Sequence, residues 1–134
     1  MKELFGNSCY AYCLAYIFGK DKDIKALTAR VLDGWYFDYI QEDGFVKKPV
    51  DYVKMIDNSL KFRDVKKVPI SSLSDIPNDL IVAVEYKYLG GSHFVVCQKG
   101  KVLFDPSEPS NSVRNGKPVS YRLFFLIPYN SDFN

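Results

Sequence analysis

Three residue types in this chain carry the chemistry of a nucleophilic site: Cys9, the single histidine His93, and Asp105. A thiolate can attack a carbonyl carbon when a base stands beside it. The base needs a third group that fixes the tautomer and the orientation of its ring. In that scheme Cys9 is the nucleophile, His93 the base and Asp105 the orienting group. The pattern predicts thiol-dependent acyl chemistry if the fold brings the three together.

Each of these residues also has a purely structural interpretation. Cys9 fits a small buried hydrophobic residue, His93 fits a hydrogen-bonded structural residue on a strand, and Asp before Pro106 is a common turn initiator. The joint order favours chemistry over these alternatives. A cysteine opens an apolar helix, a histidine begins a strand after Gly90-Gly91, and an aspartate ends the strand that pairs with it.

The element that must position Cys9 is the stretch from Gly6 to Gly19, which reads as a turn followed by a buried helix. Asn7 or Ser8 can cap this helix, and Gly19 is placed to end it. The first turn of a helix carries a partial positive charge and unpaired N–H groups. These favour the thiolate of Cys9 and could hold the oxyanion of an acyl-transfer intermediate.

The element that must position His93 and Asp105 is a hairpin. Residues 92–98 read as a strand, Lys99-Gly100 as a tight turn, and residues 101–104 as the returning strand, which stops at Asp105. Folding back at the turn brings residues 93–97 alongside residues 102–106. We therefore expect Asp105 near His93. Alternation places His93, Val95 and Cys97 on one face of the strand.

The order of elements predicts an α+β fold, with N-terminal helices packed on a C-terminal antiparallel sheet in one domain over residues 1–134. A second helix follows a cap at Asp23, and a third begins at Pro49. An aromatic run at residues 35–40 either packs in the core or lines a substrate groove. The further strands are expected over residues 62–68, 80–86 and 120–127.

Composition excludes several classes of function. Eighteen basic residues stand against 16 acidic ones, for a net charge of +2, so neither nucleic acid nor an acidic membrane surface is the expected partner. No apolar run is long enough to span a bilayer, and Met1–Leu4 does not begin a signal peptide. Three cysteines cannot all pair, so free thiols in the cytoplasm are expected. No cofactor is expected, and the partner is a peptide or protein substrate.

The cysteines and the histidine also raise the alternative of a metal site. Cys9 and Cys13 lie one helical turn apart and could share a metal ion. His93 and Cys97 lie about 13 Å apart along a strand and cannot both join them. A structural zinc site is therefore disfavoured and no metal is expected. Cys13 and Cys97 are predicted to be core residues where the helix meets the sheet.

The same residues resemble a known family. Cys9 followed by Ala11, Leu14 and Ala15, then Ser92-His93-Phe94-Val95-Val96, then Val102-Leu103-Phe104-Asp105-Pro106, are similar to the papain-like cysteine peptidases. The nearest likeness is to the compact bacterial branch typified by the bacteriocin-processing peptidase domains of export ABC transporters, with a looser likeness to small phage- or plasmid-borne bacterial proteins. The resemblance implies a papain-like fold. It also implies Cys9 as nucleophile, His93 as general base and then acid, and Asp105 as the orienting residue.

One position departs from that family. The family usually carries a glutamine about six residues before the cysteine to bind the oxyanion, and Glu3 stands there instead. A carboxylate is a poor oxyanion donor unless it is protonated. Asn7 carries an amide donor and could substitute, together with the Cys9 backbone N–H. The sequence thus predicts a cysteine peptidase or amide hydrolase. Transfer of the acyl group to an amine, and a degenerate fold that only binds a peptide or protein, remain as alternatives.

Overall fold

The computed structural model describes residues 9–19, 48–60, 62–106 and 116–126. The expected second helix, the aromatic run at residues 35–40 and the candidate residues Glu3 and Asn7 lie outside these ranges. The described elements are α1 (Cys9–Gly19), α4 (Pro49–Ile56), β1 (Phe62–Pro69), η2 (Leu73–Asp75), β2 (Val82–Tyr88), β3 (Gly91–Gln98), β4 (Lys101–Phe104) and β5 (Lys117–Leu126).

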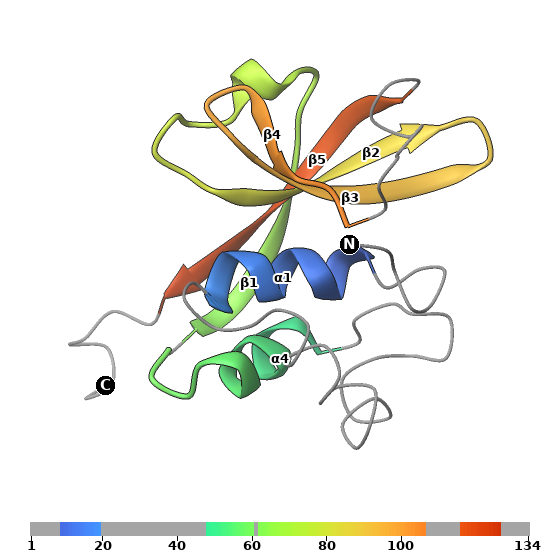
Figure 1. Ribbon diagram of the computed structural model, residues 1–134. Helices are drawn as coiled ribbons and strands as arrows, with labels where there is room; N and C mark the ends of the chain where they lie inside the picture. The colour runs from blue at the N-terminus through green and yellow to red at the C-terminus, as the bar shows by residue number, and fades with distance from the viewer. Residues whose placement is uncertain (1–8, 20–47, 61, 107–115, 127–134) are drawn as a thin grey trace.

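The strands form a five-stranded antiparallel sheet in the order β1-β5-β2-β3-β4 (Figure 1). Two tight hairpins build its β2-β3-β4 side. The β3–β4 turn uses Lys99 and Gly100 at positive φ, 54° and 74°, which is the turn predicted from this pair. The β2–β3 turn uses Leu89 and Gly90, where φ is 104°. β2 begins and ends two residues later than the strand expected over 80–86. Gly91, expected to precede the next strand, is the first residue of β3.

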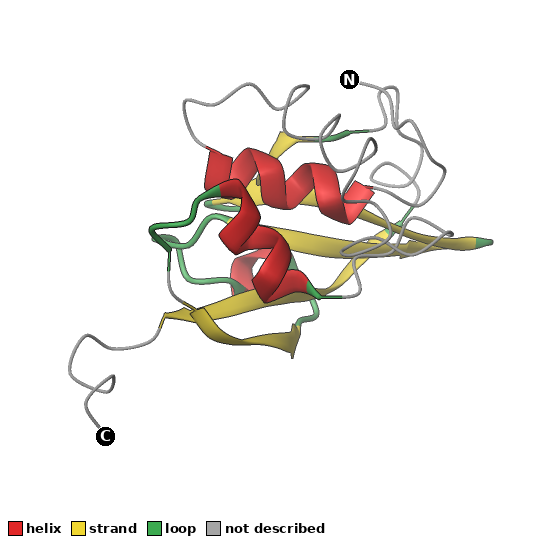
Figure 2. Cartoon of the chain, turned by 90° about the horizontal axis from the view of Figure 1, so that it is seen from below, coloured by secondary structure: helices red, strands yellow, loops and turns green. Residues whose placement is uncertain are grey.

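Both described α-helices lie on one side of the sheet (Figure 2). α4 begins at Pro49, as predicted for a proline at the first helical position, and buries Val53 and Ile56. α1 packs mainly on β3 and β2. The prediction of an α+β fold with helices against an antiparallel sheet is confirmed. Neither described helix has the length and apolarity needed to cross a membrane.

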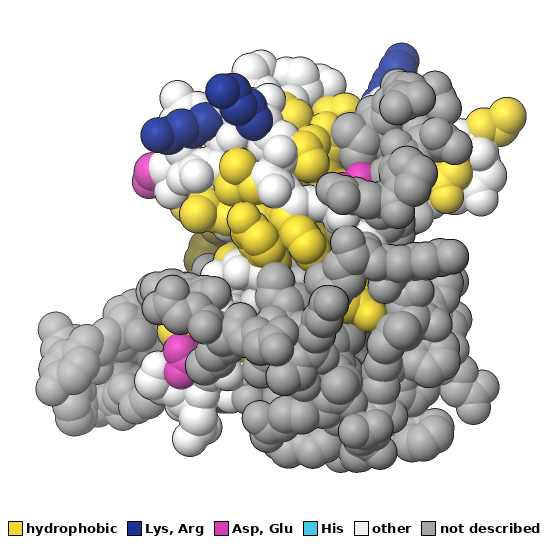
Figure 3. All heavy atoms as spheres, in the orientation of Figure 1, with side chains coloured by type: hydrophobic (Ala, Val, Ile, Leu, Met, Phe, Trp, Pro, Cys, Tyr) yellow, Lys and Arg dark blue, Asp and Glu magenta, His cyan; other side chains and the backbone are white. Residues whose placement is uncertain are grey.

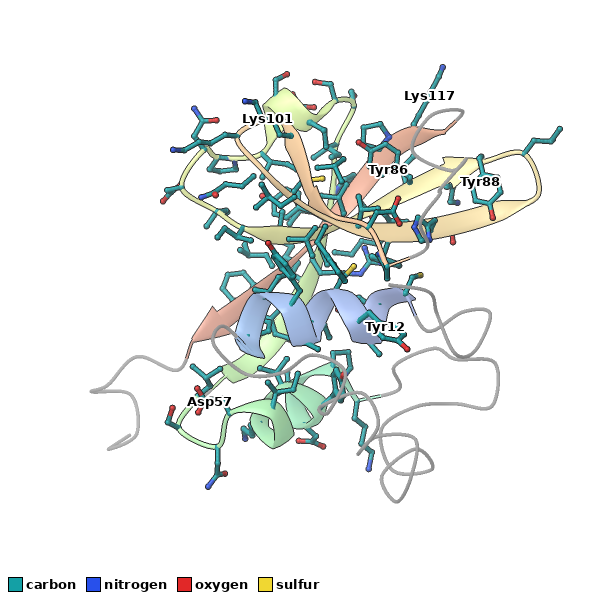
Figure 4. The ribbon with its side chains drawn as sticks, viewed as in Figure 1. Tyr12, Asp57, Tyr86, Tyr88, Lys101 and Lys117 are labelled. Carbon is teal, nitrogen blue, oxygen red and sulfur yellow. The ribbon has the colours of Figure 1, made fainter. Side chains whose placement is uncertain are left out.

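The sheet separates two hydrophobic clusters. Phe94, Val96 and Ala83 join the cluster around α1 and α4, while Val95, Val84 and Tyr86 belong to the second cluster on the other face. In Figure 4 Tyr86 lies on the side of the sheet away from α1, and Tyr12 lies on α1 on the side towards α4. This alternation along β2 and β3 is the one expected for strands buried on both faces.

The prediction that both Cys13 and Cys97 lie at the junction of helix and sheet is wrong for Cys97. Cys13 is fully buried in the α1 cluster, but Cys97 belongs to the second cluster. The reason is the period of a strand, which places Cys97 on the face of Val95 and His93 and away from α1.

One long-range hydrogen bond ties the two helices together. The hydroxyl of Tyr52 in α4 donates to the backbone carbonyl oxygen of Ala11 in α1 at 3.0 Å. Tyr52 is fully buried, and burial raises the pKa of its phenol far above the ordinary range, so the hydroxyl stays a donor. The bond holds α4 against the first half of α1, the part that carries Cys9.

Replacing Tyr52 by phenylalanine is expected to lower the free energy of unfolding by about 1–2 kcal/mol, because a buried hydrogen bond is lost while the ring is kept. Denaturant unfolding measures this. Tyr88→Phe is the matched control, because Tyr88 is 39% exposed at the end of β2. Equal stability of the two variants would contradict the role assigned to the Tyr52 hydroxyl.

Candidate active site

The histidine and the aspartate singled out in the sequence lie in contact. His93 Nε2 and Asp105 Oδ1 are 2.7 Å apart, although the two residues are separated by 12 positions in the chain. Both side chains are largely enclosed, with 7% and 12% of their surface exposed. The expectation that the β3–β4 hairpin brings Asp105 near His93 is confirmed.

A bulge in β4 decides the face on which Asp105 lies. Near the turn Cys97 pairs with Val102, but the next pair is Val96 with Phe104, so one residue of β4 is left over. Without that shift, continued pairing would set Asp105 opposite Phe94 on the α1 face. With the shift, it falls opposite Val95, diagonal to His93 and on the same face. A bulge thus turns the carboxylate towards the imidazole.

Cys9 reaches the same edge of the sheet from the other side. The backbone N–H of Phe94 donates to Cys9 Sγ at 3.4 Å. The last described pair of β3 with β4 is Val96 with Phe104, so Phe94 lies beyond the end of that ladder. The thiol at the start of α1 accepts a hydrogen bond from a backbone N–H of β3 that lies beyond the pairing with β4. It therefore lies next to the backbone of His93, the residue before Phe94.

This arrangement has definite chemical properties. An ionised Asp105 only accepts hydrogen bonds, so the 2.7 Å contact assigns the ring proton to Nε2 of His93. The other ring nitrogen, Nδ1, is then the one that can take a proton from a thiol. On the cysteine, the N–H of Phe94 and the start of α1 both stabilise negative charge on sulfur.

Comparisons with known proteins found no match for this chain. No protein-family model, no curated protein and no solved structure matches the chain. What the chain does must therefore be inferred from its own residues and their contacts.

The other two cysteines differ from Cys9 in their surroundings. Cys97 is 1% exposed, and burial raises the pKa of its thiol to about 12. Cys13 is fully buried. Cys97 therefore lacks the ionisation of a reactive thiol, and Cys13 lacks the access. Within the ranges that the structure describes, no three His, Cys, Asp or Glu side chains are grouped as metal ligands.

Some candidate residues are not placed. Asn7, the predicted oxyanion donor, and Glu3 precede the first described residue, so their role stays a prediction. The backbone N–H of Cys9, the other predicted donor, is the first of α1.

Sequence reasoning missed a polar cluster on the α1 face of the sheet. Glu85 is 8% exposed, and its Oε1 accepts a hydrogen bond from Ser120 Oγ at 2.8 Å. The same oxygen lies 3.6 Å from Arg122 Nη2 and 3.7 Å from Lys67 Nζ. A signal was present, because Glu85 interrupts the apolar run Leu80–Val84, where a carboxylate is costly unless it is paired.

Proposed function

We propose that the chain is a cysteine peptidase, or a related amide hydrolase, of the papain-like type. The observation that carries the proposal is the His93–Asp105 hydrogen bond, formed at the sheet edge where Phe94 donates to Cys9. A base whose ring nitrogen is held by a carboxylate, on the residue before the one whose N–H contacts the sulfur, supports nucleophilic thiol catalysis. The spacing of the motifs in the sequence supports the same proposal.

The reaction begins when His93 Nδ1 takes the thiol proton and the sulfur of Cys9 attacks the carbonyl carbon of an amide. Backbone N–H groups at the start of α1 hold the oxyanion of the tetrahedral intermediate. The protonated His93 then gives its proton to the leaving amine, and a thioester remains on Cys9. Water, deprotonated by His93, attacks the thioester and releases the acid. Asp105 stabilises the positive ring in both halves of the cycle.

Alkylation with iodoacetamide tests the nucleophile. Near neutral pH we expect Cys9 to be labelled at least about 100-fold faster than Cys97, since a thiol with a pKa of about 12 has very little thiolate at that pH. Peptide mass spectrometry over a time course gives the rate at each cysteine. Cys9→Ala is the control and should abolish the fast phase. Equal and slow labelling of all three cysteines would contradict the proposal.

A second candidate is a degenerate fold of the same type that binds a peptide or protein without turnover. Two observations favour it, Glu3 in place of the family's glutamine and the small exposed fractions of Cys9 and His93, 7% and 5%. Peptide that stays intact during prolonged incubation, and binds equally well to Cys9→Ala, would support this candidate. Cleavage that depends on Cys9 would exclude it.

A further inference from the structure

A cavity on the helix face of the sheet is lined by Tyr10, the residue that follows Cys9 in α1. Its volume is about 340 Å³, enough for the side chain of one residue of a bound peptide. Two of its lining residues are close to the thiol in the structure. Tyr10 follows Cys9 in α1, and the backbone N–H of Phe94 donates to the Cys9 sulfur. The remaining lining is Pro49, Val65, Lys67, Glu85, Ser92 and Arg122.

The lining carries more positive than negative charge. Among the described residues around it, Lys67 and Arg122 supply two cations and Glu85 supplies one carboxylate. Arg122 is held firmly, because Nη1 donates to Ser120 Oγ at 2.8 Å and the guanidinium lies 5.0 Å from the centre of the Phe94 ring. A guanidinium that is already fixed loses little conformational freedom when it binds a ligand.

Tyr10 carries a hydroxyl donor that none of the described residues uses. The residue is 7% exposed, and its buried hydroxyl has no hydrogen-bond partner among the described residues. Burial raises the pKa of this phenol well above its ordinary range, an effect that Arg122 opposes only in part, so the hydroxyl keeps its proton. Buried polar groups are normally paired, and an unpaired donor on a residue that lines a cavity points to a missing acceptor.

We propose that this cavity binds a carboxylate group of the substrate, with Tyr10 and Arg122 as donors and Lys67 at the more exposed end. A single negative charge balances the one unmatched cation. A doubly charged phosphate would meet the carboxylate of Glu85 in the same cavity and is disfavoured. This proposal rests on the proposed function. If Cys9 cleaves a peptide, the bound carboxylate belongs to an acidic residue or to the free C-terminus of that peptide.

The test measures binding without chemistry, in a Cys9→Ala protein titrated with blocked amino acids and followed by NMR shifts. N-acetyl-glutamate amide carries only a side-chain carboxylate, N-acetyl-glycine carries only a terminal one, and N-acetyl-glutamine amide carries none. We expect at least one of the two acids to bind about tenfold more tightly than the neutral amide. The acid that binds identifies the source of the carboxylate. Equal binding of all three would overturn the proposal.

Variants separate this site from a general attraction of anions. Tyr10→Phe is expected to weaken binding of the acid about tenfold while leaving the free energy of unfolding unchanged or raised, because the lost hydroxyl has no partner within the described structure. Lys67→Gln should weaken binding about two- to threefold. Lys66→Gln is the matched control. Lys66 is the neighbour of Lys67 in β1, but it lies on the other face of the sheet and is exposed.

The possible outcomes distinguish the two proposals. Acid binding that Tyr10→Phe reduces, in a protein whose Cys9 proves unreactive, supports the carboxylate site and removes the hydrolase. Fast labelling of Cys9 with no preference for acids supports the hydrolase and removes the site. Unchanged affinity in Tyr10→Phe, or equal losses in Lys66→Gln and Lys67→Gln, would also overturn the site.

Discussion

Replacing Asp105 by alanine is expected to slow alkylation of Cys9 by about 100-fold at about pH 6.5, and to slow any turnover at least as much. Without the carboxylate, the ring of His93 loses the acceptor 2.7 Å from Nε2. The ring is then free to rotate and to adopt the other tautomer, in which Nδ1 carries the proton and cannot take one from the thiol. The positive ring that forms on proton transfer also loses its counter-charge.

The pH profile distinguishes this role from simple damage to the fold. As pH rises towards about 10, the thiol ionises without help, so the rates of the parent protein and Asp105→Ala should converge. Asp105→Asn is the matched control. Its amide oxygen can still accept from Nε2 but carries no charge, so we expect a loss of about tenfold. A folded Asp105→Ala protein that reacts like the parent at about pH 6.5 would contradict the role assigned to Asp105.

Much of the fold could be predicted because strong local signals agree with the final packing. Pro49 at the start of α4, the Lys99–Gly100 turn and the apolar helix from Cys9 to Gly19 all appear as expected. These signals depend on backbone conformations that only a few residues favour. The start of β2 was less well predicted, because Leu80 and Ile81 have the composition of a strand but precede the first residue that pairs with β3.

The candidate site could be predicted only in part. The hairpin accounts for the nearness of His93 and Asp105, but the face of the sheet depends on the bulge in β4. Counting from the turn sets Asp105 opposite Phe94, which is the wrong face. No local sequence signal in Val102–Phe104 predicts the extra residue of the bulge. Its position follows from tertiary packing, in which Phe104 stacks on Tyr16 of α1 at 4.7 Å and so must face the helix.

The approach of Cys9 to Phe94, across 85 positions, is likewise a product of packing and not of any local pattern. The polar cluster around Glu85 was missed because a single strand shows only that a carboxylate is out of place. Its partners come from β1 and β5, and pairing with those strands cannot be counted from a short turn.

That cluster gives the second large prediction. Replacing Glu85 by alanine is expected to lower the free energy of unfolding by about 2–3 kcal/mol, because Arg122 and Ser120 keep their buried polar groups but lose the acceptor that satisfies them. Ser120 is fully buried, and the Arg122 side chain is 18% exposed. Lys67, whose side chain is 59% exposed, is solvated either way. Urea unfolding with a constant m-value measures the change.

Removing the whole cluster should cost far less than removing its acceptor. In the triple variant Glu85→Met, Ser120→Ala and Arg122→Met, no polar group of the trio is left unpaired, and apolar side chains of similar volume fill the space. We expect its free energy of unfolding within about 1 kcal/mol of the parent. If so, stability does not explain why charged residues occupy this face of the sheet, and the triple variant should be folded yet lose its preference for carboxylates. A triple variant less stable than Glu85→Ala would show instead that the cluster is needed to hold β2 and β5 together.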